Sequence, residues 1–207
     1  MNILSFIATL ALAITLMEGL YILLRDPRGA LNRLFFLISL CLALWLLGGA
    51  FGYSSPTREG AFFWFRVSSP GFIFLHCLVL HFALRYTGVA GGAWTWLLYL
   101  PSLFFLHISF SDGLVFSDIY QSGNYWVMVP NYEALSFYLF VANYLGYYLI
   151  SLALLFVHIR KTRSIRIRGQ SRVIFAAVVF TIASYNIEPF LAPLLFDYMT
   201  YGQAPLY

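Results

Sequence analysis

Apolar runs of about 20 residues recur along this chain of 207 residues, and they limit what it can fold into. Hydrophobic residues make up 61% of the sequence and charged residues only 10%, against roughly 25% charged in soluble domains. A helix of about 20 apolar residues crosses a hydrocarbon core ~30 Å thick. The sequence therefore predicts an all-α polytopic membrane protein, with residues 1–207 forming a single transmembrane domain.

Six membrane-spanning helices are expected, separated by links that contain Pro, Gly or charged residues. Their approximate ranges are 3–24, 31–53, 60–86, 94–110, 132–159 and 170–196. Pro70 and Gly71 are expected to kink the third helix. Residues 114–129 predict a small β-hairpin, because two runs rich in β-forming residues flank turn residues at 121–124.

A basic link at residues 158–172 predicts the orientation of the chain. It contains six of the twelve Lys and Arg residues: Arg160, Lys161, Arg163, Arg166, Arg168 and Arg172. A link this basic stays on the cytoplasmic side of the membrane. Because successive helices cross the membrane in opposite directions, four more basic residues also lie on the cytoplasmic side: Arg25, Arg28, Arg33 and Arg85. Ten of the twelve Lys and Arg residues are then cytoplasmic. The N-terminus and the hairpin are then extracellular, and we expect a multi-pass protein of the inner (plasma) membrane.

Composition and motifs argue against several other classes. The net charge of +4 comes from basic residues beside the membrane, so it does not indicate a nucleic-acid partner. Cys41 and Cys77 both lie in apolar runs without metal-ligand spacing, so no metal site is expected. No nucleophile triad, Walker loop or paired-carboxylate motif is present. We therefore predict no catalytic residue and no cofactor, and leave enzymatic activity uncertain.

Polar side chains in the outer half of the expected bundle suggest a ligand pocket. An ionisable residue inside a membrane costs roughly 2.5–3.5 kcal/mol on insertion scales, so each needs a partner or a function. A rise of about 1.5 Å per residue places Arg66 and Glu188 at similar depth. The predicted ligand-binding residues are Trp64, Arg66, Asn143, Tyr144, Asn186 and Glu188. The alternative is an interhelical ion pair and a tyrosine stripe that only stabilise packing.

A second pair, Glu18 and His81, lies nearer the inner face of the membrane and is a candidate proton relay. The alternative is a single satisfied hydrogen bond. His76, beside Cys77, is a lone histidine near the middle of the third helix, which is weak evidence for a metal.

Several short stretches, in order, carry a resemblance to a known family: NRLFFL at 32–37, ALWLLG at 43–48, FWFR at 63–66, HFALRYTG at 81–88, YLPS at 99–102, the basic link, and GQAPL at 202–206. Together they resemble the seven-transmembrane N-terminal sensor region of bacterial histidine kinases. The resemblance covers nearly the whole chain. It implies a seven-helix sensor bundle, of which the sequence contains six predicted helices.

In that family a seventh helix leads into cytoplasmic PAS, kinase or cyclase domains. We identify no seventh apolar run, phosphoacceptor or ATP-binding segment, so we expect a fragment of a longer receptor or a stand-alone remnant. The resemblance implies a two-component-system sensor that detects an extracellular or membrane-borne signal, either a small molecule or lipid-like, for a cytoplasmic signalling domain in cis or in trans. Assembly as a homodimer is left open. The alternative is a small transporter or channel subunit that uses Glu18 and His81.

Overall fold

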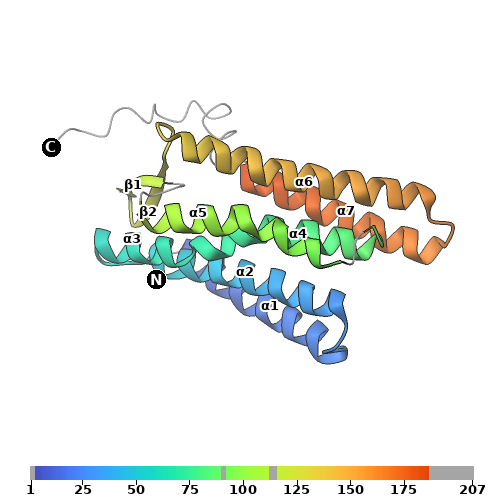
Figure 1. Cartoon of the computed structure of the whole chain (residues 1–207). Coiled ribbons are helices and arrows are strands. Elements are labelled where there is room, and N and C mark those ends of the chain that lie inside the picture. Colours follow the sequence, from blue (N-terminus) through green and yellow to red (C-terminus); the bar gives the residue numbers. More distant parts are fainter. Residues whose placement is uncertain (1–2, 90–91, 112–115, 187–207) are drawn as a thin grey trace. The chain divides into compact units, whose positions relative to one another are not determined.

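Helices dominate the computed structural model, which describes residues 3–89, 92–111 and 116–186. They are α1 (Ile3–Arg25), α2 (Ala30–Gly52), α3 (Arg58–Val67), α4 (Ser69–Tyr86), α5 (Leu100–Ser111), α6 (Leu135–Lys161) and α7 (Ile165–Asn186), with a 3₁₀ helix, η1 (Ala93–Tyr99), before α5 (Figure 1). The strands β1 (Phe116–Ser122) and β2 (Tyr125–Pro130) form a two-stranded antiparallel sheet. The predicted all-α fold with one small hairpin is confirmed.

In the described part of the chain, four helical segments are long and apolar enough to cross a bilayer: Ile3–Arg25, Ala30–Gly52, Arg58–Tyr86 and Leu135–Lys161. They correspond to the first, second, third and fifth expected helices. The fourth expected helix is divided into η1 and α5, each too short to span alone. α7 begins at Ile165 rather than near residue 170, so its first turns include three arginines. Residues 187–196 of the sixth expected helix lie outside the described residues.

The chain divides into two compact units, Met1–Ser151 and Leu152–Tyr207, and α6 continues from the first into the second. In the first unit α2 packs against α1, α3 and α4, while α5 and η1 pack against α4 (Figure 1). That both units form one domain stays a prediction.

The third span breaks at Ser68, where α3 ends and α4 begins. Pro70 lies in the first turn of α4, where its missing N–H removes no helical hydrogen bond. The hydroxyl of Ser68 donates to the carbonyl of Phe65 at 2.6 Å and satisfies a backbone group at the break. The third expected helix is therefore interrupted at Ser68, two residues before Pro70, while the kink itself stays a prediction.

Glycines let the helices of the first unit approach closely. Gly48 and Gly52 form a G-x-x-x-G pair on α2, and a Cβ at either position would collide with side chains of the α3–α4 segment. Gly71 of α4 is equally close to α2. A Cβ there would lie 2.5 Å from the carbonyl oxygen of Cys41 and 2.8 Å from the backbone nitrogen of Trp45. The spacing between α2 and α4 therefore depends on the absence of a side chain at Gly71.

The hairpin has the predicted turn. β1 and β2 pair from Ser122 opposite Tyr125 to Phe116 opposite Pro130, with an irregularity between Phe116 and Asp118. Gly123 begins the turn with φ of +61°, a left-handed conformation that glycine adopts without a Cβ penalty. Residues 114 and 115 of the expected hairpin lie outside the described residues.

Gly71→Ala is expected to lower the free energy of unfolding by about 1–3 kcal/mol, because its Cβ meets the backbone of α2 rather than a movable side chain. Gly146→Ala in α6 is the matched control, since a Cβ there has no neighbour within 4 Å. Thermal unfolding of the purified protein in detergent, followed by circular dichroism, compares the two. Equal stability of the variants would contradict close packing of α2 on α4.

Candidate functional site

A buried polar pair joins α4 to α6 in the first unit. His76 is 1% exposed, and its Nε2 shares a hydrogen bond of 3.2 Å with Oδ1 of Asn143. Both residues lie within segments that are apolar enough to span a bilayer. An interhelical hydrogen bond is a way to satisfy polar groups where lipid offers none.

Aromatic rings surround this pair. The His76 ring lies 5.6 Å from the Phe140 ring, 6.3 Å from the Tyr144 ring and 5.6 Å from the Tyr147 ring, centroid to centroid. The Tyr147 hydroxyl donates to the carbonyl of Leu98 at 2.9 Å and so links α6 to η1. The packing is tight, since Phe140 is 1% and Tyr144 2% exposed. Any relative shift of α4 and α6 must therefore rearrange a defined set of contacts.

The structure places Trp64 and Arg66 elsewhere, on α3. The Trp64 ring stacks on Phe51, with centroids 4.5 Å apart. The Arg66 guanidinium lies 4.8 Å from the centroid of the Phe62 ring, and its buried Nε has no hydrogen-bond acceptor among the described residues. Arg66 precedes His76 by ten residues, about 15 Å along a helix.

The structure therefore brings together only some of the residues of the predicted pocket. Asn143 and Tyr144 meet His76, which sequence reasoning had considered only as weak evidence for a metal. Asn186 ends α7, in the second unit, and Glu188 lies outside the described residues. The ligand-binding role of all six residues stays a prediction.

Glu18 and His81 are not joined by an ion pair. Nδ1 of His81 shares a hydrogen bond of 2.8 Å with the Tyr99 hydroxyl. Its Nε2 is buried without a partner among the described residues, while Glu18 is exposed on α1. The described residues contain no group of three or more His, Cys, Asp or Glu side chains that could hold a metal ion.

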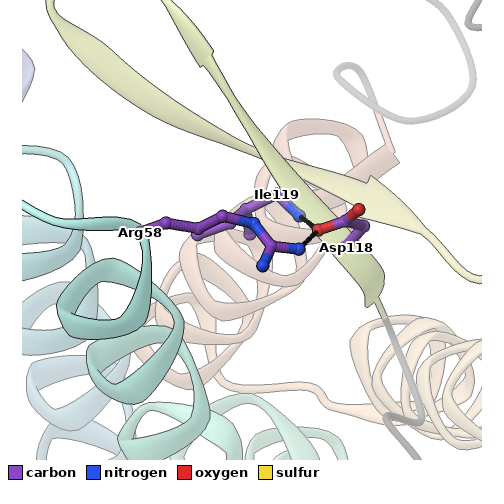
Figure 2. Close-up of polar contacts among 3 residues, drawn as sticks. All are labelled: Arg58, Asp118 and Ile119. Atoms are coloured by element: carbon purple, nitrogen blue, oxygen red, sulfur yellow. Dashed lines mark hydrogen bonds and ion pairs between the residues drawn. The ribbon is translucent and has the colours of Figure 1, made fainter. Parts of the chain in front are cut away.

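The hairpin is fastened to α3 by a polar contact that sequence reasoning did not anticipate. Figure 2 shows the Arg58 guanidinium forming an ion pair with the Asp118 carboxylate, which also accepts the N–H of Ile119 at 2.7 Å. The Trp126 indole N–H donates to the carbonyl of Ser55 at 2.9 Å. Beneath these contacts is a small core of Ala61, Phe65 and Ile119, with Tyr53, Phe62, Trp126 and Met128 at its edge. The hairpin is thus fixed to one end of the first unit.

The ion pair responds to acid. Partial burial alone would raise the pKa of the Asp118 carboxyl, but the hydrogen bonds from Arg58 and Ile119 and the guanidinium charge hold this pKa below its ordinary value. The stabilisation is complete above the unfolded pKa of about 3.9 and is lost as the pH falls through the lower folded value. Since both side chains are more than half exposed, the pair contributes at most about 1 kcal/mol.

The sequence did contain a signal for the buried pair. His76 and Asn143 are both polar residues within apolar runs, and each needed a partner. No sequence signal predicts the rotation of the two helices that makes these side chains face each other.

Comparison with known protein families gives a match that covers nearly the whole chain. The family described as the N-terminal 7TM region of histidine kinase matches residues 3–204. The chain belongs to this family. As a histidine kinase sensor region it is a transmembrane protein of signal transduction, and the resemblance noted from the sequence is confirmed. No curated protein and no solved structure matches the chain.

In this sensor region, Asn143→Ala is expected to destabilise the fold by about 1–3 kcal/mol, because it leaves the buried His76 without its partner. A double-mutant cycle with His76→Ala should give a coupling energy of about 0.6–1.7 kcal/mol. Thermal unfolding in detergent measures both values. Leu139→Ala is the control on the same helix, since Leu139 is 50% exposed. Additive effects of Asn143→Ala and His76→Ala would show that the pair has no energetic role.

Proposed function

We propose that this sensor region detects a signal at its hairpin end or within the membrane and relays it to a cytoplasmic output such as a histidine kinase, in cis or in trans. The observation that carries the proposal is the contrast between the two ends of the first unit. Acidic residues gather at the hairpin end: Glu59, Asp118 and Glu133. Cations gather at the opposite end of the first unit, around the α1–α2 link and the end of α4, where Asp26 is the acidic residue among them: Arg25, Arg28, Arg33 and Arg85.

This contrast supports an orientation with the hairpin outside the cell. Cytoplasmic links carry the excess of Lys and Arg. The two cations at the hairpin end are Arg58, which pairs with Asp118, and Arg66, which lies against an aromatic ring. With the α6–α7 turn also inside, ten of the twelve basic residues are cytoplasmic, and the protein lies in the inner membrane with its N-terminus outside.

A continuous set of contacts supports the relay from hairpin to α6. Ile119 of β1 packs with Phe65 of α3, and α3 leads through the break at Ser68 into α4. On α4, His76 contacts Asn143 of α6. A signal that displaces the hairpin or α3 would therefore act on α4 and then on α6.

Trp64 and Arg66 remain candidate contacts for the signal. Arg66 offers a half-buried cation whose Nε has no acceptor among the described residues. Such a group would favour a signal with an anionic or carbonyl oxygen beside an apolar part.

The relay is tested by grafting the chain into a histidine kinase of the same family, in place of the segment that matches residues 3–204. Asn143→Leu, which removes the hydrogen bond between α4 and α6, should change the autophosphorylation rate by about fivefold or more, the lower range of coupling between sites. Leu139→Ala, at a half-exposed position of α6, should leave the rate unchanged.

Membrane insertion and thermal unfolding are measured on each graft, so that a misfolded chain is not mistaken for a loss of signalling. Unchanged kinase output in folded Asn143→Leu would contradict the relay. Proton uptake into vesicles that disappears in Glu18→Gln, together with unchanged kinase output, would instead support transport.

A further inference from the structure

The turn between α6 and α7 carries a dense group of cations that the proposed relay does not use. We call it the basic turn and define it by Arg160, Lys161, Arg163, Arg166, Arg168 and Arg172. α6 ends at Lys161 and α7 begins at Ile165, so only three residues separate the helices. Residues 158–186 contain no Asp or Glu, so the positive charge has no counter-charge within this segment.

Two of these cations are used within the turn itself. Arg168 donates from Nη2 to the carbonyl of Thr162 at 2.7 Å, and from Nε at 3.3 Å, which closes the turn. The Arg160 guanidinium lies 4.5 Å from the centroid of the Phe156 ring. The other four are exposed, and the described part of the chain provides them with no hydrogen bond or ion pair: Lys161, Arg163, Arg166 and Arg172.

Exposed apolar side chains are interspersed with these cations. Ile165 is 86% and Val173 70% exposed, and Phe156 and Val157 are each 46% exposed. Cations mixed with exposed apolar groups fit the boundary between lipid head groups and acyl chains. An acidic soluble protein or a nucleic acid would leave the apolar groups in water.

The length of α6 brings the basic turn to this boundary. Its 27 residues extend about 40 Å, which exceeds a hydrocarbon core of ~30 Å. The last turns of α6 therefore reach the head groups on the side where the helix ends.

We infer that the basic turn binds the phosphate groups of the membrane's own anionic phospholipids, with Lys161, Arg163, Arg166 and Arg172 as the contacting cations. Each Lys or Arg near an anionic membrane surface changes association roughly fivefold. The four together would therefore concentrate anionic lipid around the turn and hold α6 and α7 at a fixed depth.

The test measures lipid composition beside the turn. The full-length protein with Ser164→Cys carries a fluorescent donor in the turn and is reconstituted into phosphatidylcholine vesicles. Trace acyl-labelled acceptor is added as phosphatidylglycerol or as phosphatidylcholine. We expect local phosphatidylglycerol to exceed phosphatidylcholine roughly fivefold or more. This ratio of phosphatidylglycerol to phosphatidylcholine should approach one in K161Q/R163Q/R166Q/R172Q. It should stay within about twofold of the unsubstituted value in K161R/R163K/R166K/R172K, which keeps the charge.

A donor at Asn124→Cys in the hairpin turn is the positional control and should show no phosphatidylglycerol excess. Circular dichroism checks folding, and R163Q/R166Q, with two charges removed, should give an intermediate excess. Equal quenching by the two lipids at Ser164→Cys, an excess that survives the fourfold Gln substitution, or an equal excess at Asn124→Cys would each overturn the inference. Competition by inorganic phosphate at constant ionic strength would also overturn it, because it would indicate a site for free phosphate.

Discussion

The inability of hydrocarbon to solvate charged groups or unpaired backbone groups governs how this chain folds. It explains why the chain forms long helices whose own hydrogen bonds satisfy the backbone. It also explains why cations gather at helix ends and why the buried polar residue His76 is paired with Asn143. The hairpin can exist because it packs on the end of α2–α3 rather than within a span.

Two kinds of packing work together in the first unit. Glycines such as Gly48 and Gly71 bring α2 against the α3–α4 segment, where little adjustment is available. Between α4 and α6 the contact is instead made by aromatic rings around one polar pair. Close glycine contacts suit a fixed scaffold, whereas a polar pair between helices suits an element with two arrangements. This division is consistent with a sensor in which α4 and α6 move against a stable α2.

Much of the fold followed from the sequence because its signals were local. Run length predicted the four described segments that are apolar enough to span, and the turn residues around Gly123 predicted the hairpin. The candidate site was harder to predict from the sequence, because it depends on which faces of the helices contact each other. The sequence suggested Glu18 with His81, whereas the structure pairs His81 with Tyr99 and brings His76 to Asn143. Arg66 with Glu188 stays a prediction, because Glu188 lies outside the described residues. Depth along a helix can be counted from a sequence, but rotation about its axis depends on packing. The match to the histidine kinase sensor family covers residues 3–204 and thus both the spans and the hairpin.

In the proposed orientation the hairpin faces the outside of the cell and the basic turn faces the cytoplasm. Single reporter cysteines at Asn124→Cys and Ser164→Cys, treated with a membrane-impermeant maleimide in intact cells, test it most directly. Cys41 and Cys77 lie within membrane-spanning segments, and the unmodified protein measures their background. We predict labelling at position 124 in intact cells and at position 164 only after the membrane is opened. Labelling at position 164 in intact cells, with position 124 protected, would contradict it.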